Sequence, residues 1–173
     1  EVAALKGTTF IIKNIFFNSP ARRKFLKKDS IEGGYISEII NRLALAHPNI
    51  SFTYINNGVE IFKTIGDNDL KNTAFYIYGK EICKKLIPIK ASKNGFNIEG
   101  LIGLPELSRG NRSYENFFIN GRYIKSNIVQ SAIEEGYGGK LMIGKFPIFI
   151  INMTVPENTV DVNVHPAKLE VRF

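Results

Sequence analysis

The fold class follows from one stretch, Ile50-Ser51-Phe52-Thr53-Tyr54-Ile55-Asn56-Asn57-Gly58-Val59-Glu60-Ile61-Phe62-Lys63-Thr64-Ile65. Its first residues alternate between apolar and polar side chains, which predicts a half-buried strand. Asn57-Gly58 is the strongest hairpin signal in the chain, because a type I′ turn needs positive φ at both central positions. The partner strand is expected over residues 59–65, so the two segments form an antiparallel pair.

Similar patterns place the remaining elements. Further strands are expected over residues 8–13, 86–91, 96–104, 117–120 and 146–155, and an alternating pattern runs through residues 160–173 with a turn at His165-Pro166-Ala167. Helices are expected over residues 21–28, 35–46 and 126–137, with a loop over residues 29–34, and another helix is capped by Asp67 or Asn68 and ends at Gly79. Hairpins without a regular βαβ rhythm predict an α+β two-layer sandwich, in which helices cover one face of a mixed or antiparallel sheet.

The composition is that of an ordinary globular chain. It has 173 residues, of which 44% are hydrophobic and 23% charged, and this excludes a disordered chain. The longest apolar runs fall far short of the roughly 20 residues that span a bilayer. A single cysteine, Cys83, excludes an internal disulfide, argues against a zinc site and is expected to be buried. The chain starts at Glu1 without an initiator Met, so we expect it to be an internal piece of a longer protein.

Basic residues point to a polyanionic partner. The net charge is +7 at pH 7, which attracts nucleic acid or an acidic membrane. The run Arg22-Arg23-Lys24-Phe25-Leu26-Lys27-Lys28 follows Ser19-Pro20, a pair typical of a helix start. Its like charges repel one another on a helix, so phosphate contacts explain the run somewhat better than a solvated basic face does.

A second basic group brackets the strand expected at residues 117–120. It consists of Arg109, Arg112, Arg122 and Lys125, and these side chains either gather at one rim or lie scattered over the surface. Two weaker candidates are Gly7-Thr8, which suits close approach to a ligand, and Lys168, which suits a phosphate. From the residues alone, Gly7-Thr8 is more often an ordinary strand start and Lys168 more often a solvated lysine. The sequence holds no nucleophile–base set and no Walker-type phosphate loop.

Four blocks of the sequence resemble the MutL family of DNA mismatch repair proteins. They occur in the family's order and cover nearly the whole chain: residues 7–26, which end in Pro20-Ala21-Arg22-Arg23-Lys24-Phe25-Leu26; Arg42-Leu43-Ala44-Leu45-Ala46-His47-Pro48; Phe118-Ile119-Asn120-Gly121-Arg122; and residues 160–173, with His165-Pro166-Ala167-Lys168 at their centre. Long ungapped blocks of this kind are highly specific.

The resemblance implies a split ATPase of the GHKL type, similar to those of gyrase and Hsp90. Residues 1–20 would end the ATPase domain, and residues 21–173 would form a transducer-like domain that shares its fold with a small-subunit ribosomal protein. Gly7 and Thr8 match the last nucleotide motif, and Lys168 matches the lysine that reaches the γ-phosphate. The residues expected to bind DNA are Arg22, Arg23, Lys24, Lys27, Arg112, Arg122 and Lys125.

The resemblance also sets limits on catalysis. The family's catalytic Glu, Mg-binding Asn and adenine-binding Asp are not in this chain, so we expect ATP and Mg to be cofactors of the parent ATPase. We expect no catalytic residue, no metal ligand and no ATP hydrolysis in this chain alone. Expected partners are DNA, a mismatch-recognition protein of the MutS type and a second copy on ATP binding, in a bacterial-type cytoplasm without membrane contact. Rival interpretations are a gyrase-type transducer, a small-molecule kinase of the GHMP class, which would need a phosphate loop that the sequence lacks, and a basic nucleic-acid-binding module without ATP coupling.

Overall fold

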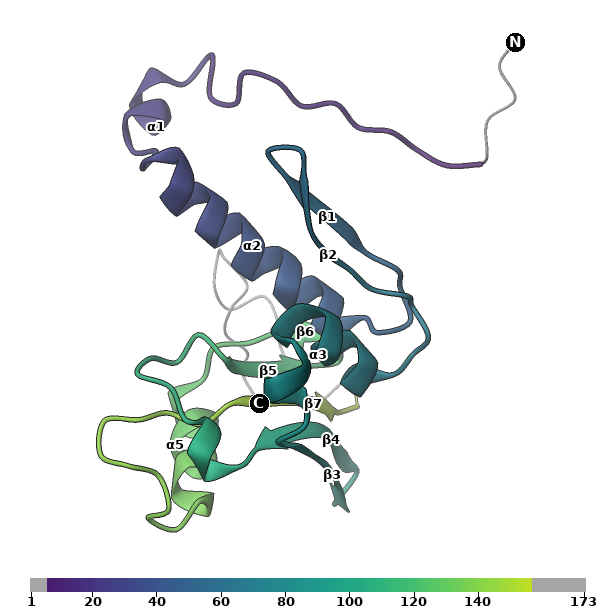
Figure 1. The fold of residues 1–173 in the computed structure, drawn as a ribbon, viewed down its shortest axis with the longest axis vertical. Helices are drawn as coiled ribbons and strands as arrows, with labels where there is room; N and C mark the ends of the chain where they lie inside the picture. Colours follow the sequence, from purple (N-terminus) through teal and green to yellow (C-terminus); the bar gives the residue numbers. More distant parts are fainter. Residues whose placement is uncertain (1–5, 157–173) are drawn as a thin grey trace. The chain divides into compact units, whose positions relative to one another are not determined.

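The computed structural model describes residues 6–156 of the chain and divides into two units, Glu1–Ile36 and Ser37–Phe173 (Figure 1). The strands expected within residues 160–173, and with them Lys168, lie outside the described residues. The domain boundary expected after residue 20 stays a prediction.

The first unit contains a short basic helix. α1 (Pro20–Lys24) begins at the proline that follows Ser19, although the Ser19 side chain makes no capping hydrogen bond, and the helix is shorter than the expected span to residue 28. The strand predicted over residues 8–13 is wrong. All six of these residues are exposed, and no neighbouring strand among the described residues offers their backbone groups a partner.

α2 (Asp29–Ala46) replaces the loop that was predicted over residues 29–34. Its first turn carries Asp29 and Glu32, and Glu32 Oε1 accepts a hydrogen bond of 2.7 Å from the backbone amide of Lys27. Acidic groups at a helix N-terminus interact favourably with the helix dipole. This offsets the helix-forming cost of the two glycines there, about 1 kcal/mol each. The helix ends before His47-Pro48, as predicted.

The second unit is built on a five-stranded mixed sheet (Figure 1). Its strands are β3 (Leu86–Lys93), β4 (Phe96–Gly103), β5 (Glu115–Ile119), β6 (Arg122–Tyr123) and β7 (Phe149–Thr154), in the order β3-β4-β7-β5-β6. β5 and β7 run parallel, and the other neighbouring strands run antiparallel. The predicted α+β class with a mixed sheet is confirmed.

The hairpin predicted at Asn57-Gly58 forms a separate two-stranded sheet. β1 (Thr53–Asn56) pairs with β2 (Val59–Lys63), and the turn residues Asn57 and Gly58 have φ values of 50° and 79°, as a type I′ turn requires. The rings of Tyr54 and Phe62 pack with centroids 5.9 Å apart. The Tyr54 hydroxyl lies 3.1 Å from Ser37 Oγ, so this face of the hairpin meets α2.

Helices cover both faces of the five-stranded sheet. On one face, the end of α2 and α3 (Leu70–Tyr78) contribute Leu45 and Ala74 to a core with Phe118 and Ile150. On the other face, α5 (Asn127–Gly136) packs against a second core, which consists of Phe117, Ile119, Ile124, Phe149, Ile151 and Val155. The expected helix layer on one face therefore holds for α2 and α3, whereas α5 makes a third layer.

The cap of α3 lies one or two residues later than predicted, and the one-turn helix that follows α3 was not predicted. α3 is capped by Asp69 rather than by Asp67 or Asn68, because Asp69 Oδ1 accepts hydrogen bonds from two amides of the first helical turn. Gly79 ends the helix with a φ of 83°, as predicted. The one-turn helix α4 (Lys80–Cys83) follows and buries Cys83, and a 3₁₀ turn, η1 (Pro105–Leu107), follows β4.

We predict that Gly100→Ala destabilises the second unit. A Cβ at Gly100 would overlap the carbonyl oxygen of Ile150 and lie 2.8 Å from Ile151 Cα, both on the neighbouring strand β7. Overpacking of this kind costs typically about 1–3 kcal/mol. Denaturant unfolding should show the loss, while the control Gly110→Ala, whose Cβ would have open space, should stay within about 0.5 kcal/mol of the wild type. Equal midpoints for the two variants would contradict the prediction.

Candidate nucleic-acid interface

The turn between β5 and β6 places Arg122 at the edge of the sheet. Arg122 pairs with Ile119 and Tyr123 pairs with Phe118 across the two strands. Cross-strand partners share a face and successive residues alternate, so Arg122 and Tyr123 are directed to opposite faces. The Arg122 side chain is half-buried on the edge strand, and Lys125 beyond it is exposed. Both cations are within reach of a ligand at this edge.

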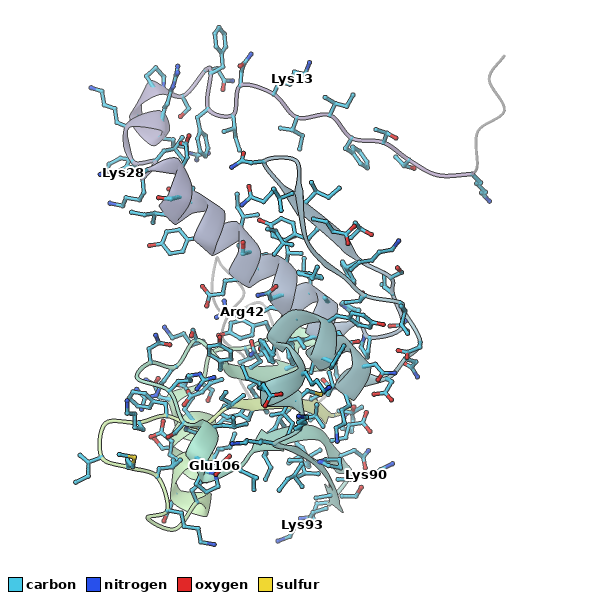
Figure 2. All side chains as sticks on the ribbon, in the orientation of Figure 1. Lys13, Lys28, Arg42, Lys90, Lys93 and Glu106 are labelled. Carbon is cyan, nitrogen blue, oxygen red and sulfur yellow. The ribbon has the colours of Figure 1, made fainter. Side chains whose placement is uncertain are left out.

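Tyr123, the residue after Arg122, packs against Arg42 of α2. The Arg42 guanidinium carbon lies 3.9 Å from the centroid of the Tyr123 ring, and Arg42 lies between α2 and the sheet (Figure 2). Arg42 is ion-paired with Glu38 one helical turn earlier. Burial raises the pKa of Tyr123, which stays a neutral phenol. Because its charge is matched and its ring contact is internal, Arg42 supports the fold rather than a ligand.

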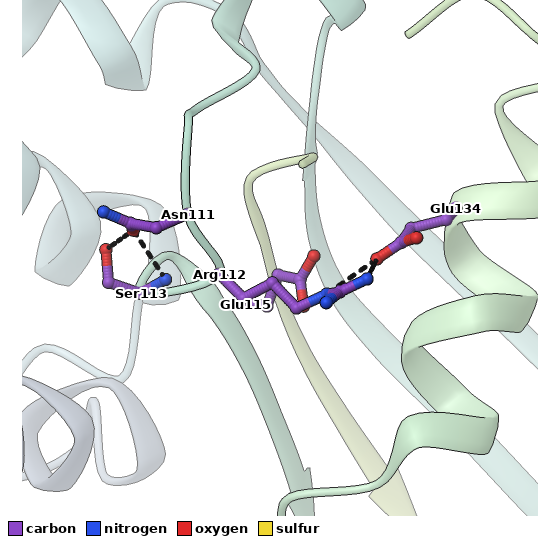
Figure 3. Close-up of polar contacts among 5 residues, drawn as sticks. All are labelled: Asn111, Arg112, Ser113, Glu115 and Glu134. Carbon is purple, nitrogen blue, oxygen red and sulfur yellow. Dashed lines mark hydrogen bonds and ion pairs between the residues drawn. The ribbon is translucent and has the colours of Figure 1, made fainter. Parts of the chain in front are cut away.

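Arg112 makes ion pairs at the other end of β5. Its Nε and Nη2 donate hydrogen bonds of 3.0 and 2.8 Å to Glu134 Oε1 on α5 (Figure 3). The guanidinium carbon also lies 4.0 Å from the ring centroid of Phe146. Nε is 3.5 Å from Glu115 Oε2. These contacts tie the loop before β5 to α5, and they occupy Nε and one of the Nη2 donors of the guanidinium.

Glu115 is a buried carboxyl group at the first position of β5. Its side chain is fully buried, and neither carboxylate oxygen has a hydrogen-bond partner. Burial, and to a lesser extent the nearby Glu134, raises the pKa of Glu115 to about 7, while Arg112 opposes the shift. Glu115 is therefore protonated in a large fraction of molecules near neutral pH.

The single rim of basic residues considered from the sequence is not formed. Arg109 and Arg112 precede β5, whereas Arg122 follows it, so the two pairs of cations are separated by the length of the strand. Arg109 is bridged through its backbone to Phe146, and its guanidinium carbon lies 5.4 Å from the Tyr114 ring centroid. Of these four cations, Arg122 and Lys125 both follow β5 in the chain.

The basic run of the first unit is exposed along its length. Arg22, Arg23, Lys24, Lys27 and Lys28 are all solvent-exposed, and none of them takes part in an ion pair among residues 6–156. Phe25 in the same run is 80% exposed. A dense, unpaired set of cations is the arrangement that binds phosphates. Lys13 and Lys28 mark this unit in Figure 2.

The nucleotide-binding candidates are only partly described. Gly7 and Thr8 are exposed and outside any helix or strand, and Lys168 lies outside the described residues. A cleft of about 650 Å³ lies instead between the end of α2, the start of α3 and strands β3, β4 and β7. None of the expected site residues that the structure describes lines this cleft. Among the described residues, no group of three or more His, Cys, Asp and Glu side chains is arranged to hold a metal ion.

The polar contacts that organise this region could not be predicted from the sequence. The stack of Arg42 on Tyr123 and the pair of Arg112 with Glu134 join residues far apart in the chain. The strand was expected to end at Asn120, but the partner of the Asn120 side chain, Val155 just after β7, carries no signal in the sequence. The one available hint was a charged residue, Glu115, directly beside an apolar strand.

Comparisons with known proteins identify the class of protein. A family model described as "DNA mismatch repair protein, C-terminal domain" matches residues 75–173, which is more than half of the chain. A curated DNA mismatch repair protein MutL from Agathobacter rectalis is 49% identical over 173 residues, which are 100% of this chain and 26% of that protein.

Two solved structures have a similar fold. The N-terminal domain of a DNA repair protein superposes with a TM-score of 0.75 at 18% identity, over 91% of this chain and 53% of that one. The Aquifex aeolicus MutL ATPase domain complexed with ADP superposes with a TM-score of 0.60 at 26% identity, over 82% of this chain and 50% of that one.

The chain belongs to the MutL family of DNA mismatch repair proteins. It spans about a quarter of the length of the curated relatives that it matches. Within residues 6–156, no helix has the combination of length and apolar content needed to cross a membrane.

We predict that stability falls as pH rises through the pKa of Glu115. The pKa is about 7 in the folded protein against 4.5 for an unperturbed group, so the folded state holds a proton that the unfolded state has lost. The stability present below about pH 4.5 should be lost progressively up to about pH 8, by as much as about 3 kcal/mol for this shift. Glu115→Gln should flatten this part of the curve of unfolding free energy against pH. Parallel curves for the wild type and the variant would show that Glu115 titrates normally.

Proposed function

We propose that this chain completes the ATP site of a MutL-type mismatch repair protein and carries part of its DNA-binding surface. The observation that carries the proposal is the 49% identity to a MutL protein over the full length of the chain. The exposed, unpaired basic run of the first unit and the edge cations Arg122 and Lys125 supply groups of the right charge. A gyrase-type transducer receives no comparable support.

The DNA surface consists, in this proposal, of phosphate contacts without base recognition. Arg22, Arg23, Lys24 and Lys27 form one group, and Arg122 with Lys125 forms another. Arg112 was expected to join them, but its guanidinium already binds Glu134 and stacks on Phe146, so we assign it the weakest DNA contact of the set. Cations that neutralise phosphates bind all sequences with similar affinity.

The nucleotide role rests on Gly7, Thr8 and Lys168. The similarity to an ATPase domain solved with ADP supports ATP, with Mg, as the cofactor of the parent protein. In this proposal Lys168 approaches the γ-phosphate from the second domain, and the parent protein hydrolyses ATP while this chain alone does not. Partners proposed for the parent are DNA, a MutS-type mismatch-recognition protein and a second MutL copy on ATP binding, in the cytoplasm of a bacterial cell.

We predict that charge reversal in the basic run weakens DNA binding uniformly. The triple substitution of Arg22, Arg23 and Lys24 by Glu removes three cations, so the slope of log affinity against log salt should become shallower by about 2–3. Affinity should fall equally for duplexes of unrelated sequence. Fluorescence anisotropy over a salt series with the full-length protein measures both quantities.

A matched control separates local contact from net charge. Lys63, Lys90 and Lys93 are exposed and form no ion pair among the described residues, so changing all three to Glu alters the net charge by the same six units. The control should retain most of the salt slope. If the two triple variants lose DNA affinity and salt slope equally, the loss reflects net charge alone. That result would contradict a direct contact between the basic run and DNA.

We predict that Lys168→Ala in the full-length protein slows ATP hydrolysis and leaves ADP affinity nearly intact. A cation brought from a separate domain reaches only the terminal phosphate, where charge develops during transfer. Loss of one charge-stabilising contact typically reduces the rate on the order of 10²–10³. Steady-state turnover and ADP titration of the same preparation test this, and normal turnover would remove the assigned role of Lys168.

A further inference from the structure

The side chain of Asn120 behaves as an additional peptide group of the sheet. The parallel ladder of β5 and β7 ends at the pair Ile119 and Met153, and the Asn120 amide still donates to the Met153 carbonyl at 2.9 Å. Beyond this point the hydrogen bonds are made by the side-chain carboxamide of Asn120. Its Oδ1 accepts from the Val155 amide at 3.0 Å, and its Nδ2 donates to the Val155 carbonyl at 3.0 Å. The ladder is thus extended by one side chain.

The next residue of the turn is also fastened to β7. The Gly121 amide donates to Asn152 Oδ1 at 3.2 Å. Gly121 has a φ of 76°, and a Cβ there would lie 3.4 Å from His47 Cε1 at the end of α2. Asn120 itself has a φ of 48°, a conformation that asparagine tolerates better than other side-chain-bearing residues. The turn is therefore fixed to β7 by both of its residues.

The fixed turn sets the direction of Arg122. Arg122 follows Gly121 directly and lies opposite Ile119, the last residue of β5. Tyr123 is packed on the other face between Phe118, whose ring centroid is 6.0 Å away, and Arg42. With Tyr123 half-buried on one face and the turn fastened to β7, the backbone at Arg122 is held, and with it the direction of the Arg122 Cα–Cβ bond. A side chain ordered before binding loses less conformational entropy when it meets a phosphate.

We propose that Asn120 is a positioning residue for Arg122, holding the β5–β6 turn so that the guanidinium is pre-oriented towards a nucleic-acid phosphate. This inference rests on the proposed DNA-binding role of Arg122 and adds to it a residue that touches no DNA. Asparagine fits the task because it combines the left-handed conformation with a paired donor and acceptor. Glycine would keep the conformation and lose both hydrogen bonds, and aspartate would keep the acceptor but lose the donor.

The test is a double-mutant cycle in the full-length protein, with duplex DNA as the probe. Asn120→Gly should weaken DNA binding by about three- to ten-fold, the cost of ordering one long side chain on binding. Arg122→Ala should weaken binding and make the salt slope shallower by about 0.9, which corresponds to one phosphate. In the Arg122→Ala background, Asn120→Gly should change affinity by less than about two-fold, because the group that it positions is gone. Asn120→Asp should fall between wild type and Asn120→Gly.

The β1–β2 hairpin supplies the matched control. Asn57→Gly is the same substitution, in an Asn-Gly turn with a φ of 50°, and its side chain makes no hydrogen bond in the described residues. It should leave DNA affinity unchanged. Unfolding midpoints of every variant establish that each is folded at the temperature of the titrations.

The outcomes separate the positioning role from the DNA-binding role. If Arg122→Ala weakens binding but Asn120→Gly does not, or if the two effects add in the double variant, Asn120 does not position Arg122. If Arg122→Ala leaves affinity and salt slope unchanged, Arg122 does not contact DNA. Asn120 then has no DNA-binding residue to position. A loss in Asn120→Gly that disappears in the Arg122→Ala background supports the proposal.

Discussion

β7 is hydrogen-bonded on both sides, antiparallel to β4 and parallel to β5, and the rest of the second unit is arranged around it. A parallel pair cannot be joined by a tight turn, so the chain between β5 and β7 must cross the sheet. It does so through β6 and α5, which covers the face opposite α2 and α3. The parallel pairing thus explains both the third layer and the position of Arg122 on an edge strand.

The charged residues at the two ends of β5 differ in their contacts. At its start, Glu115 is buried beside Arg112 and Glu134. The Arg112 guanidinium forms ion pairs that join the loop before β5 to α5. At its far end, the turn residues are satisfied by amide and backbone groups, so the charge of Arg122 is not consumed by an internal ion pair. β5 thus has a buried carboxyl group at its start and, just beyond its end, a cation that forms no ion pair among the described residues.

Local sequence patterns predicted correctly those features that depend only on residues close together in the chain. The hairpin at Asn57-Gly58, the helix stop at His47-Pro48 and the end of α3 at Gly79 were all correctly predicted, because each depends on backbone conformations that a few neighbouring residues fix. The strand expected over residues 8–13 failed because a strand needs a partner for its backbone groups. The loop expected over residues 29–34 is instead the start of α2, where Asp29 and Glu32 favour the helix N-terminus.

The sequence by itself determined the α+β class, the family, the positions of most elements and the identity of the candidate cations. Those properties follow from composition, periodicity and contiguous motifs. The tertiary structure alone decided that α5 lies on the second face, that Arg112 is bound internally while Arg122 is not, and that Asn120 is fastened to Val155. The last two outcomes depend on hydrogen bonds between residues 22 and 35 positions apart, whose energies come from burial and hydrogen-bond geometry that no local pattern records.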